Sequence, residues 1–279
     1  MELSPEPELT LTYAHRVHAR VEAPPQLGGG QSLRSIMRLR QTPVRVGADS
    51  LDVRVEIADL SLSADSVPEE QLPDLERHEG ATYLARMTTR GELIRMSEES
   101  GRGGADRAGG ISPVQRSVRM SAFPTLPAGP VRPGDTWVDT TRVETGVMQG
   151  MGEGTTLAVS RTTLDGLHRE GTTRIAQLST VTSYTFRPAD TGRSGIEAHM
   201  SGSGSADVRF DVTNGRYLHS DAAQDYTVNL RYPGGDRTYS VRFHVDSEAQ
   251  LVGIGESREP QEDDPGGDST GRREEPPGG

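Results

Sequence analysis

The chain has 279 residues and a formal net charge of −11, and only 32% of its residues are apolar, which is few for a globular protein. The acidic balance argues against nucleic acid as a partner, since phosphate binding depends on clustered Lys and Arg. The sequence contains no Cys and no Lys, which excludes disulfides, thiol and Schiff-base nucleophiles, thiolate zinc sites and the P-loop lysine.

The first eight residues have neither the basic nor the apolar segment of a signal peptide. No stretch approaches the roughly 20 apolar residues of a membrane helix, so we expect no transmembrane segment. The chain as given is therefore expected in the cytoplasm. Residues 4–8 (SPEPE) nevertheless resemble the Pro- and acid-rich tether that follows a removed export signal, which keeps an upstream segment as an alternative.

Strand signals dominate the first half of the chain. Apolar and polar residues alternate between Leu9 and Val21, which predicts a strand with one buried face. Two prolines and three glycines then end it. Residues 33–46 and 51–57 flank a turn at 47–49 and predict a hairpin. Further strands are expected at 83–94 and around 114–120, with loops at 65–80 and 101–110.

The second half continues the same pattern after a Pro-rich passage at 123–136, which we expect to connect the halves because Pro cannot donate to a strand ladder. No convincing amphipathic helix appears. The strands expected are near 138–147, 155–164, 172–186, 195–212, 216–232 and 238–252. Short turns between neighbouring strands predict an antiparallel meander.

The two halves echo each other. Residues 83–94 align without a gap on residues 207–218, and each stretch predicts a strand, a tight turn with Gly and a second strand. We therefore predict an all-β fold: a duplicated antiparallel meander of about twelve long strands that form curved or barrel-like half-sheets. The expected units are 8–122, a connection at 123–136, 137–255, and a disordered acidic tail at 256–279.

No motif carries enough chemistry to name a reaction. Asp190-Thr191-Gly192 has the form of an aspartic-protease motif, but the first half offers no partner for it, and a surface turn is the simpler interpretation. His15 and His18 are three residues apart on one strand and face opposite sides. We therefore expect no catalytic residues, no metal ligands and no cofactor.

Three places are candidates for ligand binding. Gly202 and Gly204 lie within a strand, where Gly marks either a bend or room cleared for a ligand. Met148 and Met151 sit in a Gly-rich hairpin tip that could form an apolar gate. Tyr13 and His15 share the apolar face of the first strand, where a hydrogen-bonded core His is the alternative to a ligand contact. Trp137 is expected to fill the core at the base of the second half.

Residues 123–127 (FPTLP) and 131–137 (VRPGDTW), with 210–216 (FDVTNGR) later, resemble an uncharacterised family of exported, often lipid-anchored bacterial β-rich proteins. The resemblance covers most of residues 8–252 in layout and only these stretches in sequence. It implies a location in the cell envelope or periplasm and a curved antiparallel sheet, loosely similar to bacterial lipoprotein carriers. It supplies no catalytic residues.

These observations favour a non-catalytic, envelope-associated module that binds a hydrophobic or amphipathic ligand, such as a lipid, in a curved sheet. The alternative is a structural protein of the envelope that contacts a protein partner through its strand edges and acidic tail. A hydrolase whose site is assembled from distant residues is the third hypothesis.

Overall fold

The structure is a computed structural model that describes residues 1–27, 29–65, 78–100, 123–146, 153–188, 197–232 and 237–256. These residues form eleven strands and one short 3-10 turn, η1 (Pro25–Leu27). The strands are β1 (Leu9–Glu22), β2 (Gln31–Val46), β3 (Ser50–Ala64), β4 (Thr82–Thr88), β5 (Leu93–Ser100), β6 (Thr136–Gly146), β7 (Glu153–Glu170), β8 (Thr173–Pro188), β9 (Glu197–Asp211), β10 (Arg216–Arg231) and β11 (Thr238–Glu256).

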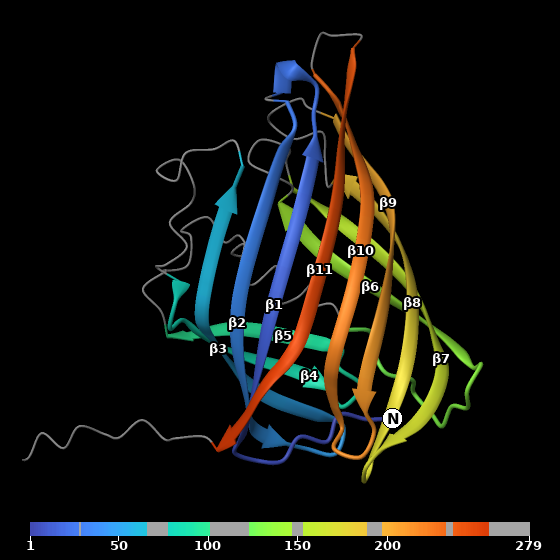
Figure 1. Cartoon of the computed structure of the whole chain (residues 1–279). Helices are drawn as coiled ribbons and strands as arrows, with labels where there is room; N and C mark the ends of the chain where they lie inside the picture. The colour runs from blue at the N-terminus through green and yellow to red at the C-terminus, as the bar shows by residue number, and fades with distance from the viewer. Residues whose placement is uncertain are drawn as a thin grey trace, which may run out of the picture.

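All eleven strands belong to one antiparallel sheet with the order β5-β4-β3-β2-β1-β11-β10-β9-β8-β7-β6. Strands that are consecutive in the chain therefore pair, except β5 and β6, and the pairing of β1 with β11 joins the two halves. The sheet is strongly curved and unclosed, with β5 and β6 as its edges (Figure 1). The predicted all-β antiparallel meander is confirmed, with eleven strands in one continuous sheet.

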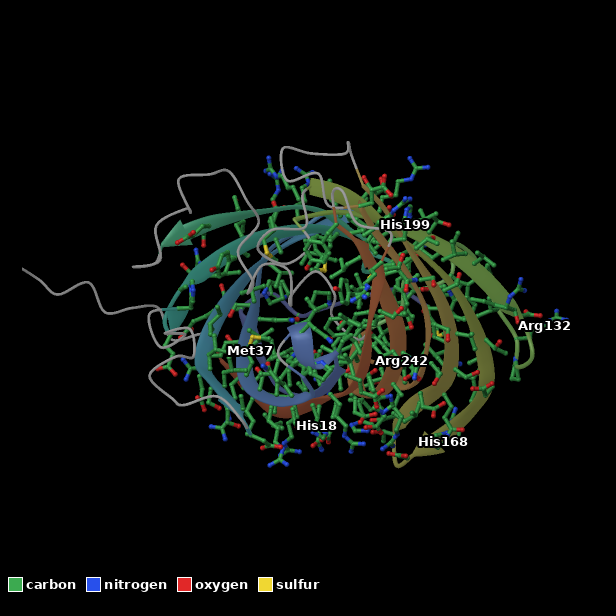
Figure 2. The ribbon with its side chains drawn as sticks, turned by 90° about the horizontal axis from the view of Figure 1, so that it is seen from above. His18, Met37, Arg132, His168, His199 and Arg242 are labelled. Atoms are coloured by element: carbon green, nitrogen blue, oxygen red, sulfur yellow. The ribbon has the colours of Figure 1, made fainter. Side chains whose placement is uncertain are left out.

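The period-2 alternation of the sequence sets the two faces of this sheet. Tyr13 on β1, for example, pairs with Leu39 on β2 and with Leu251 on β11, so apolar residues meet on the inner face. The outer face carries ion pairs such as Arg16–Glu248 at 2.9 Å and Arg40–Glu56 at 2.8 Å. Viewed from above, the sheet wraps around an interior filled with side chains, with His18 and His168 outside the curve (Figure 2).

The two echoing stretches form hairpins of the same kind. The β4–β5 turn contains Gly91 at φ 87°, and the β9–β10 turn contains Gly215 at φ 61°, a backbone conformation that side chains disfavour. The N-terminal segment connects the two turns, because Leu3 N donates to Thr89 O at 2.7 Å and Ser4 N donates to Gly215 O at 3.2 Å. Both hairpin tips therefore lie at one end of the sheet, here called the base.

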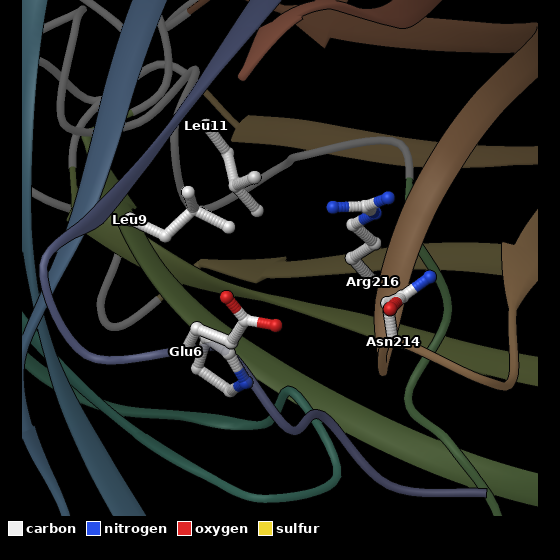
Figure 3. Close-up of a pocket in the computed structure, with 6 residues that line it drawn as sticks. Glu6, Leu9, Leu11, Asn214 and Arg216 are labelled. Carbon is white, nitrogen blue, oxygen red and sulfur yellow. The ribbon is translucent and has the colours of Figure 1, made fainter. Parts of the chain in front are cut away.

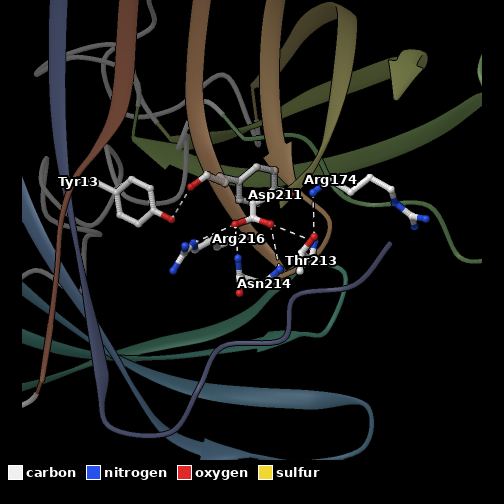
Figure 4. Close-up of polar contacts among 7 residues, drawn as sticks. Tyr13, Arg174, Asp211, Thr213, Asn214 and Arg216 are labelled. Carbon is white, nitrogen blue, oxygen red and sulfur yellow. Dashed lines mark hydrogen bonds and ion pairs between the residues drawn. The ribbon is translucent and has the colours of Figure 1, made fainter. Parts of the chain in front are cut away.

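A buried carboxylate organises the β9–β10 turn (Figure 4). Asp211 is 1% exposed and accepts hydrogen bonds from the backbone N–H groups of Thr213 and Asn214, at 3.0 and 2.9 Å. It also accepts one from the Asn214 side chain at 2.6 Å and forms an ion pair with Arg216 at 3.3 Å. The turn is thus fixed by side-chain chemistry as well as by Gly215.

The passage expected to connect the halves crosses the base. Leu126 is fully buried, its N–H donates to Arg90 O at 2.8 Å, and its carbonyl accepts from Arg90 Nε at 2.8 Å. Trp137, expected from the sequence to fill the core, is half-buried against this base, and its Nε1 donates to Thr125 O at 2.8 Å. The segment therefore ties the β4–β5 turn to the second half of the sheet.

Several predictions concern residues outside the described part of the chain. They are the strand near 114–120, the loop at 101–110, the motif at 190–192 and the acidic tail beyond Glu256. The unit boundaries at 122, 136 and 255 stay predictions, as does duplication.

Candidate functional site: the concave face of the sheet

The inner face is uncharged along most of the sheet, although on the edge strand β6 Asp139 faces inward opposite Ser160 and accepts from Thr125 Oγ1 at 2.9 Å. Strand register places on this face the alternating residues of β1 (Leu11–Val21), β2 (Gln31–Gln41), β7 (156–164), β8 (176–186), β9 (198–210), β10 (220–230) and β11 (239–251). Within these described stretches, none of the inward residues is Arg, Asp or Glu, and His15 is their one titratable group besides tyrosines. A surface of this kind suits an uncharged or apolar occupant.

An aromatic cluster, here called the base cluster, fills the lower end of this face. Tyr13 OH donates to Tyr217 O at 3.1 Å, and Tyr217 OH donates to Pro124 O. The rings of Phe123 and Tyr217 stack with centroids 4.3 Å apart, and Phe210 packs edge-on against Tyr217 at 5.1 Å. Burial raises the pKa of both tyrosines, so their hydroxyls stay protonated donors.

A second cluster, the upper cluster, lies toward the other end of the same face. Tyr226 and Phe243 stack with centroids 4.8 Å apart, beside the buried Phe186. Leu27 of η1 packs against this cluster, so the β1–β2 connection folds over the top of the interior (Figure 2). The concave face is therefore closed by packed side chains at both ends.

Between the two clusters run two rows of small side chains, here called the central strip. Cross-strand pairing defines the rows as Val17, Ser247, Ala222, Ala206, Thr180, Thr162 and as Ala19, Val245, Gln224, Gly204, Thr182, Ser160. Hydroxyls on the β7–β8 side bond each other, at 3.0 Å for Thr162–Thr180 and 2.9 Å for Ser160–Thr182. These three threonines are buried, whereas the other strip members keep partial exposure, so solvent reaches the concave face here.

Both predicted ligand contacts on β1 lie on this face: one is within the closed base cluster, and the other is beside the partly open central strip. Tyr13 is 2% exposed and belongs to the base cluster. His15 lies between Tyr13 and Val17 of the strip, is half-buried, and approaches the Phe123 ring edge-on at 6.4 Å. Its Nε2 is shielded from solvent and has no hydrogen-bond partner among the described residues. Burial lowers the pKa of His15 to about 4, so the ring is neutral at physiological pH.

This shift predicts a pH effect on stability. The folded protein binds the His15 proton only near pH 4, whereas the unfolded chain binds it near pH 6.5. The stability contributed by the neutral ring is thus complete above pH 6.5 and falls by about 1 kcal/mol per pH unit between pH 6.5 and 4. Urea unfolding of the wild type and His15→Leu should diverge over that window, with the wild type losing more stability. If the free energies of unfolding of the two proteins change in parallel with pH, the burial assigned to His15 is wrong.

Gly202 and Gly204 also lie on the concave face, but neighbouring side chains come close to both. A Cβ at Gly202 would lie 2.4 Å from Tyr226 Cβ and 2.4 Å from Asp225 O, and one at Gly204 would lie 3.4 Å from the Tyr184 ring. These glycines therefore allow Tyr184 and Tyr226 to lie close over β9. Their contact with a ligand stays a prediction.

Gly202→Ala is expected to lower the free energy of unfolding by about 1–3 kcal/mol, because the new methyl group has no room beside β10. Urea unfolding measures the change. Ser203→Ala, one residue along on the exposed outer side of β9, is the control and should change it by less than about 0.5 kcal/mol. Equal losses of stability for Gly202→Ala and Ser203→Ala would contradict the close approach of β10 to Gly202.

Outside the concave face, the described residues bring possible ligand atoms together in one cluster and line one small pocket. Met148 and Met151 fall outside the described residues. On the outer face, His219, Asp221 and Glu248 bring ligand atoms within 4.8 Å of one another, which sequence spacing alone did not indicate because Glu248 lies on β11. Arg16 already pairs with Glu248, and this charge opposes a cation there. A small pocket between Glu6, Leu9, Leu11 and Arg216 holds about 10 Å³, room for one water (Figure 3).

Comparison with known proteins gives a likeness of fold only. No family model matches the chain, and no curated protein matches it. A solved structure titled "Lipid-protein interactions in lipovitellin" is similar with a TM-score of 0.52 at 11% sequence identity, covering 91% of this chain and 26% of that one. The chain thus spans about a quarter of the length of that protein. No helix in the described part of the chain is long and apolar enough to cross a membrane.

Proposed function

We propose that the protein is a non-catalytic module that binds a hydrophobic or amphipathic ligand, such as a lipid, on the concave face of its sheet. One observation carries the proposal: within the stretches of the seven strands given above, no inward residue is Arg, Asp or Glu, and in the central strip this uncharged surface is partly open to solvent. The similarity in fold to lipovitellin, a structure whose title concerns lipid–protein interactions, supports it.

Location in the cell envelope is part of the proposal and rests on the resemblance carried by residues 123–137 and 210–216. A structural role in the envelope is the second candidate. It is favoured by the edge of β6, which pairs with no second strand among the described residues. Val138 is 53% exposed there and the adjoining threonines are also exposed, and an edge of this kind can add a strand from a protein partner.

Titration with the fluorescent apolar probe N-phenyl-1-naphthylamine tests the binding role. The expected result is a saturable rise in emission that oleyl alcohol reverses by competition. The same protein unfolded in urea is the control and should give no saturable rise, because the concave face exists only in the folded sheet. A native protein that behaves like the unfolded control would contradict the proposed function.

A further inference from the structure

Among the described residues of the concave face, one side-chain nitrogen is both shielded from solvent and without a hydrogen-bond partner. Nε2 of His15 is shielded from solvent and has no hydrogen-bond partner in the described part of the chain. A shielded polar atom without a partner costs about 1–3 kcal/mol, so proteins seldom retain one without a use. His18, three residues along on the outer face, is by contrast bonded to Ser32 Oγ at 2.9 Å.

The position of His15 suits contact with an occupant of the central strip. In the row of His15, Met37 and Ala249 flank it on β2 and β11. One inward position further along β1, Val17 is flanked by Ser35 on β2 and Ser247 on β11. All three of these residues are partly exposed. The half-buried His15 ring therefore stands at the border between the closed base cluster and the open strip.

The surroundings also restrict which polar group can bind. The ring is neutral at physiological pH because burial lowers its pKa. The inward residues around it on β1 (Leu11–Val21), β2 (Gln31–Gln41), β10 (220–230) and β11 (239–251) include no Arg, and Arg216 at the base of β10 is already paired with Asp211. A carboxylate or phosphate placed here would lose its hydration without gaining a counter-charge. A hydroxyl incurs no such penalty, because it can donate to the ring nitrogen or accept from it, whichever tautomer is present.

We propose that His15 anchors the polar end of the ligand, and that the ligand is an uncharged amphipath with a hydroxyl group, of the class of long-chain alcohols, acylglycerols or sterols. The hydroxyl bonds Nε2 of His15, and the apolar body lies along Val17, Ala19 and Val245 of the central strip. This inference rests on the proposed function, since it assigns an orientation and a class to the ligand of that same face.

Competition against N-phenyl-1-naphthylamine tests the anchor with three C18 ligands: oleyl alcohol, oleate and 1-octadecene. The wild type should bind oleyl alcohol about tenfold more tightly than oleate. His15→Leu should weaken oleyl alcohol about fivefold to tenfold, the value of one hydrogen bond, and leave 1-octadecene unchanged. His15→Gln keeps a polar group and should retain most of the affinity for the alcohol.

Two controls keep the outcomes distinct. His18→Leu changes a histidine on the outer face and should alter none of the affinities, and urea unfolding verifies that each variant is folded. If His15→Leu lowers the affinities for oleyl alcohol and 1-octadecene equally, or lowers neither affinity, His15 does not anchor the ligand. Binding to the concave face would still be supported in that case. If the wild type binds none of the three ligands, the proposed function itself is overturned.

Discussion

Asp211→Ala is expected to lower the free energy of unfolding by about 3–5 kcal/mol, a large fraction of the 5–15 kcal/mol that stabilises most domains. The carboxylate is 1% exposed and accepts from two backbone N–H groups and the Asn214 side chain. Its removal also leaves Arg216, whose side chain is 19% exposed, without its anion. The damage reaches beyond the turn, since Ser4 bonds Gly215 there.

Urea unfolding followed by circular dichroism measures this change. Asp211→Asn keeps one acceptor oxygen and should fall between Ala and the wild type. Arg40→Ala removes one partner of a solvent-exposed ion pair with Glu56, and such pairs contribute about 1 kcal/mol or less. An Asp211→Ala variant no less stable than Arg40→Ala would show that the carboxylate does not hold the β9–β10 turn.

Ala222→Trp is expected to weaken N-phenyl-1-naphthylamine binding more than tenfold. Ala222 lies in the central strip between Ala206 on β9 and Ser247 on β11, and it keeps partial exposure. An indole at this position would occupy the space above these small side chains, where the proposed ligand lies. The probe titration described for the wild type measures the loss.

Ala223→Trp is the matched control, because the next residue on the same strand faces outward, opposite Ser205 and Asp246. It is half-buried like Ala222, so the two variants differ mainly in the face that receives the indole. Thermal unfolding should show both to be folded. Equal probe affinity in the two variants would place the probe elsewhere than in the central strip.

Much of the fold could be predicted because this sequence alternates so regularly. The alternation in residues 9–21 placed Tyr13 and His15 on one buried face, and Asn214-Gly215 indicated the turn between β9 and β10. The same alternation accounts for the uncharged inner face, because successive residues of a strand point to opposite faces of the sheet once the register is known.

Long-range pairing is what the sequence could not provide. The junction of β1 with β11, residues 9–22 beside 242–256, decides that there is one sheet, and no local signal encodes it. Register also assembles the central strip from strands distant in the chain and brings Glu248 to His219. The glycines at 202 and 204 show the same limit, because the close packing of Tyr226 depends on a neighbouring strand.

Native mass spectrometry of the protein purified from its own cells, followed by solvent extraction of any bound mass, tests the central claim most directly. We expect a mass above that of the polypeptide at mild activation, and an extract that contains an uncharged, hydroxyl-bearing lipid. A bare polypeptide mass under the same conditions would contradict a lipid-binding concave face and would favour a role through protein contacts at the sheet edge.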